Sequence, residues 1–252
     1  MDLGLKGKRV LVTGGSRGIG LAVVRELRRE EAEVVAVSRK GNANEFEALG
    51  VHSVEADLTA QGSAALVAAR VRQLLDDVDG WVHCVGGVEA ACLQDDLAHT
   101  LDHWRISFNL NLITMLSVAN EILPSLITRR GAMVHIAGLS AHVAGASPLD
   151  YSVAKQALVA ASRYLAARYG PYGVRSNTIS PAPTSTRMWE KAAAANGVSL
   201  DALNSSLPAT IGMTTGRMVT PEEVASLATY LLSPRAESIT GADHVLSAGM
   251  RV

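Results

Sequence analysis

A tyrosine and a lysine four positions apart, Tyr151 and Lys155, form the pair with the clearest capacity for proton transfer. Side chains at this spacing share one face of a helix. A free phenol has a pKa of about 10, so it is a poor acid or base at neutral pH. An ammonium about 4 Å away favours the phenolate by about 4 kcal/mol at an effective dielectric of 20, before desolvation. We therefore predict that Lys155 lowers the pKa of Tyr151 into a range useful for proton transfer.

A glycine-rich string near the N-terminus lies between an apolar strand-like run and a helical pattern. Glycines permit a tight turn and let backbone N–H groups approach a pyrophosphate, while the helix N-terminus adds partial positive charge. This placement after a strand and before a helix predicts a dinucleotide phosphate site. The residues expected to contact the cofactor there are Gly14, Ser16, Arg17, Gly18, Ile19 and Gly20.

The end of the second predicted strand carries Ser38 and Arg39. Enzymes that prefer NAD have an acidic residue near this place to hold the ribose diol, and here Ser38 occupies it. A guanidinium fits a 2′-phosphate through paired hydrogen bonds, so Arg39 favours a phosphorylated ribose, with Arg17 as a second cation. The alternative is that both arginines are ordinary surface residues.

The elements that must position these residues alternate between strand and helix. This alternation predicts an α/β fold, a single-domain Rossmann-type doubly wound parallel sheet flanked by helices. The segment 184–217 is longer than an ordinary connection, and such segments are usually lids or binding loops. Strands are expected at 8–13, 33–37, 52–55, 80–85, 132–137, 175–180 and 245–247. Helices are expected at 18–31, 46–49, 63–75, 97–127 (one or two), 151–169 and 221–232.

Composition excludes several classes of function. The chain has 252 residues and a formal net charge of −1, so nothing suggests nucleic acid as a partner. Two cysteines, Cys84 and Cys92, form neither a disulfide framework nor a metal-ligand spacing, and we expect no metal and a buried Cys84. We find no signal-like N-terminus and no apolar run of about 18 residues, so we expect a cytoplasmic protein without membrane contact.

The glycine spacing G-x-x-x-G-x-G and the Tyr151–Lys155 pair together resemble the short-chain dehydrogenase/reductase superfamily, in its form of about 250 residues. The resemblance covers nearly the whole chain. It implies hydride transfer between NADP(H) and a ketone or secondary alcohol, with Tyr151 as proton donor and Lys155 holding the nicotinamide ribose. It also implies that Asn111 anchors a water for proton relay, with Asn109 as the nearby rival.

The resemblance assigns further cofactor contacts. Asp57 and Leu58 match the position that contacts the adenine, and Gly86 lies where the backbone passes the adenosine ribose. Pro181 and Thr186 match the segment that holds the nicotinamide. His83 stands in an apolar strand where the family usually has asparagine, and we expect a buried, hydrogen-bonded structural histidine.

Gly138 is the most informative departure from the family, which has a serine there, thirteen residues before the tyrosine. Loss of one oxyanion donor typically costs several kcal/mol. Ser140 is the expected substitute, either because an extended backbone points it the same way or because a shifted loop brings it to the usual place. His142 is a further potential substrate contact. Alternatives are lyase or isomerase chemistry, or cofactor binding without turnover.

The remaining expectations concern substrate and assembly. The substrate is expected to be a small molecule, covered by apolar side chains of the long connection. The Ala-rich stretch 157–167 permits close helix packing, and in this family such helices pair between subunits, so we expect a homodimer or homotetramer. The expected lid residues are Met188, Trp189, Leu203, Leu207 and Met213.

Overall fold

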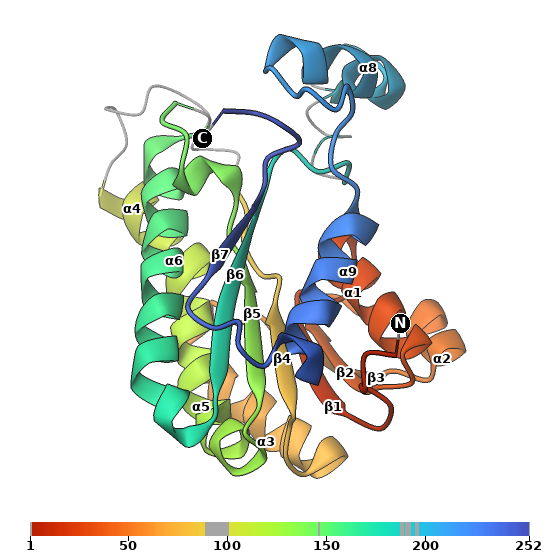
Figure 1. Ribbon diagram of the computed structural model, residues 1–252, viewed down its shortest axis with the longest axis vertical. Helices are drawn as coiled ribbons and strands as arrows, with labels where there is room; N and C mark the ends of the chain where they lie inside the picture. The colour runs from red at the N-terminus through yellow and green to blue at the C-terminus, as the bar shows by residue number, and fades with distance from the viewer. Residues whose placement is uncertain are drawn as a thin grey trace.

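The computed structural model describes residues 2–88, 101–145, 147–186, 189, 193–194 and 197–251. Within them, seven strands form one parallel sheet in the order β3-β2-β1-β4-β5-β6-β7 (Figure 1). The predicted doubly wound parallel sheet is thereby confirmed. The strands are β1 (Arg9–Thr13), β2 (Glu33–Ser38), β3 (His52–Glu55), β4 (Gly80–His83), β5 (Ala132–Ile136), β6 (Arg175–Pro181) and β7 (Asp243–Leu246).

Helices cover both faces of the sheet, as Figure 1 shows. On one face lie α1 (Gly18–Arg29), α2 (Ala43–Leu49) and α9 (Pro221–Leu232), and on the other lie α3 (Ser63–Leu75), α5 (Thr114–Arg129) and α6 (Leu149–Tyr169). The shorter elements are α4 (Leu101–Phe108), η3 (Asn109–Ile113), η4 (Leu139–Ala141), η5 (Gly170–Tyr172), α8 (Leu200–Thr210) and η6 (Pro234–Ala236).

The central strands β1, β4 and β5 are mainly apolar, because both of their faces are buried. In β1, Val10 and Val12 point to the cluster that includes α1 and α9, while Leu11 points to the cluster under α3, α5 and α6. Successive side chains of a strand point to opposite faces of the sheet, so this strand contributes to two separate hydrophobic cores. The strand order reverses between β1 and β4, and ligands of such sheets bind outside the carboxyl ends at that point.

Two predictions were wrong, one about the burial of Cys84 and one about the hydropathy of a long helix. Cys84 is half-buried rather than buried, because it lies just past the end of β4 beside Gly14; Cys92 lies outside the described residues. The run Leu101–Arg129 is long and apolar enough by length and composition to cross a membrane, contrary to our expectation. The expectation rested on the absence of an unbroken apolar run, whereas this helix has an apolar mean despite isolated polar residues such as Asn111 and Asn120. Met115, Val118 and Ile122 are buried under the sheet, as in a core helix.

The long connection after β6 also differs from its prediction, because it contains a helix. α8 begins after Ser199, whose side chain accepts a hydrogen bond from the Ala202 N–H, and it stands beyond the carboxyl ends of the strands (Figure 1). Met213 is buried in the core beside α9, so it is not a lid residue. Trp189, Leu203 and Leu207 are half-buried, and Met188 lies outside the described residues.

Two buried histidines, paired across β4 and β5, contact each other and the Trp81 ring in the centre of the sheet. His83 is fully buried, with its Nδ1 2.8 Å from the Thr13 Oγ1, which confirms the expected structural histidine. His135 is also fully buried, with its Nε2 3.3 Å from the Ser176 Oγ. Burial lowers the pKa of His83 well below its usual value and lowers the pKa of His135 to about 3.

These lowered pKa values predict a loss of stability in mild acid. Between pH 6.5 and 5 the unfolded chain protonates both imidazoles, whereas the folded chain keeps them neutral. The contribution of the two neutral histidines to the free energy of unfolding is complete above pH 6.5. Below pH 6.5 this free energy declines by up to about 1.4 kcal/mol per pH unit for each histidine. Urea unfolding at each pH measures this slope. We expect His83→Asn to remove about half of it, and an unchanged slope in that variant would contradict the assignment.

Candidate active site

The glycine string forms a cradle at the carboxyl edge of β1. Gly14 has a φ of +80°, and a Cβ atom on it would lie 2.8 Å from the Cys84 carbonyl oxygen. A Cβ atom on Gly20 would overlap the Gly14 carbonyl oxygen, so α1 can begin against the end of β1 only with glycine there. The free N-terminus of α1 thus points at the place where the strand order reverses. Such a cradle fits the pyrophosphate of a dinucleotide.

Ser38 and Arg39 lie beside this cradle, at the end of β2. Ser38 is buried and its hydroxyl donates to the Lys40 carbonyl at 2.9 Å, so this hydroxyl is already engaged in a hydrogen bond within its own turn. Arg39 and Arg17 are exposed, and neither forms an ion pair with another described residue. Two guanidinium groups are therefore available to an anion at this edge.

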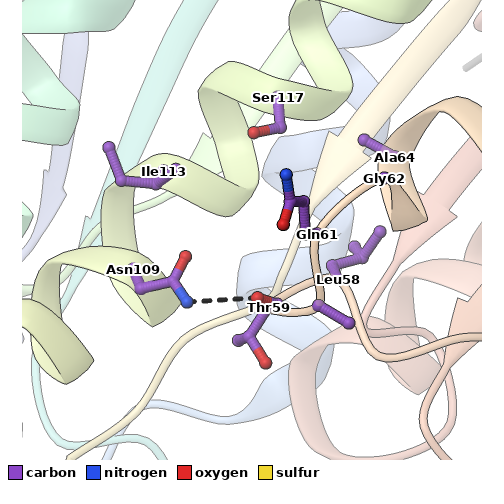
Figure 2. A pocket seen from close by; sticks show the side chains of 9 residues that line it. Leu58, Thr59, Gln61, Gly62, Ala64, Asn109, Ile113 and Ser117 are labelled. Carbon is purple, nitrogen blue, oxygen red and sulfur yellow. Dashed lines mark hydrogen bonds between the residues drawn. The ribbon is translucent and has the colours of Figure 1, made fainter.

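Asp57 and Leu58 follow β3 at the same edge. Hydrogen bonds from the Thr59 side chain and backbone, at 2.6 and 3.0 Å, lower the pKa of Asp57, and the charge of Arg39 adds to this effect. Leu58 lines a cavity of about 330 Å³ (Figure 2). The Asn109 amide reaches across this cavity and donates to the Thr59 carbonyl at 3.2 Å. Because its amide binds Thr59, Asn109 does not contact Gly86 or Lys155.

Asn111 lies in the π-helical turn η3, and π-turns within helices are frequent at functional sites. Its side chain is fully buried and pairs with Gly87, accepting from the N–H and donating to the carbonyl, both at 2.9 Å. A Cβ atom on Gly86 would lie 2.7 Å from the Lys155 Nζ and 2.8 Å from the Asn111 Oδ1. Asn111, Gly86 and Lys155 therefore meet at one point.

Tyr151 and Lys155 share the inner face of α6, as predicted. The Lys155 Nζ lies 5.7 Å from the centre of the Tyr151 ring and donates to the Ile136 carbonyl at 3.0 Å. Only 3% of Lys155 is exposed, and burial lowers the pKa of its ammonium to about 8. Lys155 is thus still mostly protonated at neutral pH.

The predicted lowering of the Tyr151 pKa was wrong. Burial of the phenol raises its pKa to about 12, and the effect that opposes this rise is a hydrogen bond with Ser140. The prediction weighed the attraction of a nearby cation but left out the cost of burying a phenolate. Tyr151 therefore carries its proton at neutral pH, as a proton donor must.

Ser140 reaches Tyr151 through a turn instead of an extended strand. After Gly138 the chain enters the 3₁₀ turn η4, which contains Ser140. A Cβ atom on Gly138 would lie 3.4 Å from the Ser140 Oγ and 3.6 Å from the Tyr151 Oη. The Ser140 hydroxyl therefore stands next to the place that a side chain on residue 138 would occupy. Of the two routes we considered, the shifted loop is the one observed.

His142 points away from this pair of hydroxyls. Its Nε2 lies 2.6 Å from the Asp243 Oδ2 on β7 and 3.4 Å from the Ser180 Oγ on β6. The ring nitrogen that we considered for a substrate contact is thus engaged by a carboxylate. The sequence analysis did not identify Asp243 or Gly87, since neither belongs to a local motif.

Pro181 and Thr186 bring the chain from β6 back to the glycine cradle. Pro181 ends β6, and the next N–H, that of Ala182, donates to the Leu246 carbonyl at 2.9 Å. A Cβ atom on Gly18 would lie 3.4 Å from the Thr186 methyl group. The segment after β6 therefore faces the start of α1 across the carboxyl edge of the sheet. The arrangement offers an anion cradle at one end and a protonated phenol at the other.

Comparisons with known proteins agree with this arrangement. A family model described as enoyl-(acyl carrier protein) reductase matches residues 14–251. L-fucose dehydrogenase of Rattus norvegicus is 31% identical over 246 residues, covering 96% of this chain and 89% of that protein. D-threitol dehydrogenase of Mycolicibacterium smegmatis is 31% identical over 261 residues, covering 100% and 95%. The structure of L-sorbose reductase from Gluconobacter frateurii, complexed with NADPH and L-sorbose, has a TM-score of 0.90 at 26% identity, covering 99% and 98%.

Proposed function

Because the chain belongs to the short-chain dehydrogenase/reductase family, we propose that it is an NADP(H)-dependent enzyme that reduces a small polyhydroxylated ketone or oxidises the matching secondary alcohol. The observation that carries this proposal is the meeting of the Ser140 and Tyr151 hydroxyls beside Gly138, with Lys155 one turn along α6. The names of the similar proteins, which act on fucose, threitol and sorbose, support the substrate class.

In this proposal the side chains handle the proton and the charge on the substrate oxygen. The bound nicotinamide supplies or takes up the hydride. Tyr151 is neutral at working pH, so it donates its proton to the carbonyl oxygen as negative charge develops there. Ser140 donates a hydrogen bond to the same oxygen. Lys155 keeps a positive charge behind the phenol, and Asn111 holds the Gly87 backbone beside it.

The cofactor lies along the carboxyl edge of the sheet in our proposal. The cradle would hold its phosphates, Asp57 and Leu58 would bind its adenine, and the backbone at Gly86 would leave room for the adenosine ribose. Lys155 and the segment after β6 would hold the nicotinamide end. The proposed contacts are Gly14, Ser16, Arg17, Gly18, Ile19, Gly20, Ser38, Arg39, Asp57, Leu58, Gly86, Tyr151, Lys155, Pro181 and Thr186. The whole chain then acts as one domain, with the segment 184–217 covering the substrate.

A preference for NADP(H) predicts a selective effect of Arg39→Leu. The guanidinium is exposed and forms no ion pair with a described residue, so a 2′-phosphate is its natural partner. A charge-assisted hydrogen bond of about 1.5–3 kcal/mol corresponds to roughly a ten- to hundredfold rise in KM for NADPH. Initial rates with both cofactors measure this rise, while KM for NADH should stay unchanged.

Arg29→Leu is the matched control, since Arg29 is exposed in the last turn of α1, at the end of the helix away from the cradle, and pairs with Glu26. It should change neither KM. Equal losses with NADPH and NADH in Arg39→Leu would show that Arg39 acts on the fold or on the shared part of the cofactor.

The proposed reaction is tested by following NADPH oxidation with a panel of ketoses and short ketones, together with product analysis. We expect stoichiometric formation of the alcohol and NADP⁺. A product of unchanged oxidation level, formed without cofactor turnover, would instead support lyase or isomerase chemistry. Tight NADPH binding with no turnover on any compound would support a cofactor-binding protein.

We also propose that the protein is a cytoplasmic homodimer or homotetramer. Large apolar side chains are exposed on neighbouring helices of one face, and pairing of these helices between subunits would remove them from water. These side chains are Leu101 and Ile106 on α4, Ile113 on η3, Leu116 on α5, and Leu149 and Tyr164 on α6.

A further inference from the structure

We infer that His142 is a positioning residue, held by the buried carboxylate of Asp243, that fixes the turn carrying Ser140. The inference rests on the proposed function, in which Ser140 donates a hydrogen bond to the substrate oxygen. A hydrogen bond joins the side chains of His142, at the end of η4, and Asp243, on β7, which lie 101 positions apart in the sequence.

Asp243 is a firm anchor because strand β6 already fixes its carboxylate. Only 3% of its side chain is exposed. The Thr178 hydroxyl donates to its Oδ1 at 2.6 Å, and the Ser180 hydroxyl donates to the same oxygen at 2.9 Å. Its other oxygen, Oδ2, lies 2.6 Å from the His142 Nε2 and 3.1 Å from the same Ser180 hydroxyl, which faces both carboxylate oxygens. A carboxylate only accepts, so the Nε2 carries the hydrogen of this contact.

His142 transmits this anchoring to Ser140 through a very short piece of backbone. His142 is the residue that ends η4, and its N–H donates to the Leu139 carbonyl at 2.8 Å. The Ala141 N–H donates to the Gly138 carbonyl at 2.9 Å, which closes the turn from the other side. Ser140 therefore lies inside a turn that is fixed at both ends. If the His142 imidazole no longer binds Asp243, the end of the turn at His142 becomes free to move.

The need for such a tether follows from the change at Gly138. A hydroxyl on residue 138 would be held at the end of β5, whose backbone is fixed by pairing with β4 and β6. The Ser140 hydroxyl instead comes from a short turn outside the sheet. A catalytic hydrogen bond loses about a hundredfold in rate when its donor is misplaced by about 1 Å. The contact from His142 to Asp243 supplies the fixation that the sheet no longer gives.

The test is a double-mutant cycle between His142→Leu and Ser140→Ala, with NADPH-dependent ketone reduction as the assay. We expect His142→Leu to lower kcat by about ten- to hundredfold, without change in KM for NADPH. In the Ser140→Ala background the same substitution should cost nothing further, because the hydroxyl it positions is gone. His142→Gln keeps an amide N–H able to reach Asp243 and should restore most of the rate.

Thermal unfolding of each variant separates positioning from a loss of folding. His52→Leu, at an exposed histidine on β3, is the matched control and should leave kcat unchanged. Equal losses from His142→Leu in both backgrounds, or no loss in either, overturn the inference while leaving the proposed reaction in place. A wild-type protein that reduces no carbonyl overturns the proposed function, and the inference with it.

Discussion

Replacement of Tyr151 by phenylalanine is expected to lower kcat for carbonyl reduction by about 10²–10⁴-fold, the range that general acid catalysis contributes. The phenol is the protonated group that shares a hydrogen bond with Ser140, and its pKa of about 12 keeps the proton in place at neutral pH. Phenylalanine retains the ring beside Lys155 and removes only the donor. Binding of NADPH, measured by quenching of protein fluorescence, should therefore be unchanged.

Tyr164→Phe is the matched control for this experiment. Tyr164 lies on the same helix, α6, but its side chain is 68% exposed and far from the turn η4 in sequence. Loss of the Tyr164 hydroxyl should alter neither kcat nor KM. If Tyr151→Phe turned over ketones as fast as the wild type, the proton would have to come from another group, and the proposed mechanism would be wrong.

The raised pKa of Tyr151 also determines which form of the phenol is present at neutral pH. A phenol with a pKa of about 12 gives up its proton only to a strong base, such as the alkoxide formed when hydride reaches a ketone. Alcohol oxidation needs the opposite form, the phenolate, which burial disfavours. The raised pKa of Tyr151 therefore favours the protonated phenol, which is the form that carbonyl reduction requires.

Local patterns in the sequence were enough to predict the cradle, the sheet and the position of Tyr151 and Lys155 on one helix. Each depends on spacing within a few residues, which backbone geometry converts directly into position. All predicted strands are present, and the largest differences are two residues, at the end of β4 and the start of β7. Helix α8 was missed although Ser199 is a good N-cap residue, because its sequence is rich in residues common in loops.

The features that could not be predicted depend on tertiary structure. The contacts of Asn111 with Gly87 and of His142 with Asp243 join segments whose distance is set by the whole sheet. The pKa of Tyr151 depends on how deeply the phenol is buried, which spacing along a helix does not reveal. The sequence left open how Ser140 reaches the site for the same reason, since a turn and a strand direct its hydroxyl differently.

The hydroxyl of Ser140, which takes the place of a serine at position 138, is expected to have a large effect on the rate. Ser140→Ala should lower kcat by about 10²–10³-fold, as loss of one oxyanion donor does. A Cβ atom on residue 138 would lie 3.6 Å from the Tyr151 Oη, so a hydroxyl there can also reach the reacting oxygen. The double variant Gly138→Ser with Ser140→Ala should therefore recover part of the lost rate.

Gly138→Ser alone should change kcat little, because its Cβ atom would lie 3.4 Å from the Ser140 Oγ, an ordinary van der Waals contact, and Ser140 still donates its hydrogen bond. The backbone itself does not require glycine, since its φ of 163° is extended. Ser152→Ala is the control, as that hydroxyl donates to the Ser147 carbonyl next to the catalytic tyrosine. A wild-type kcat in Ser140→Ala would mean that the substrate oxygen takes its second hydrogen bond from another group.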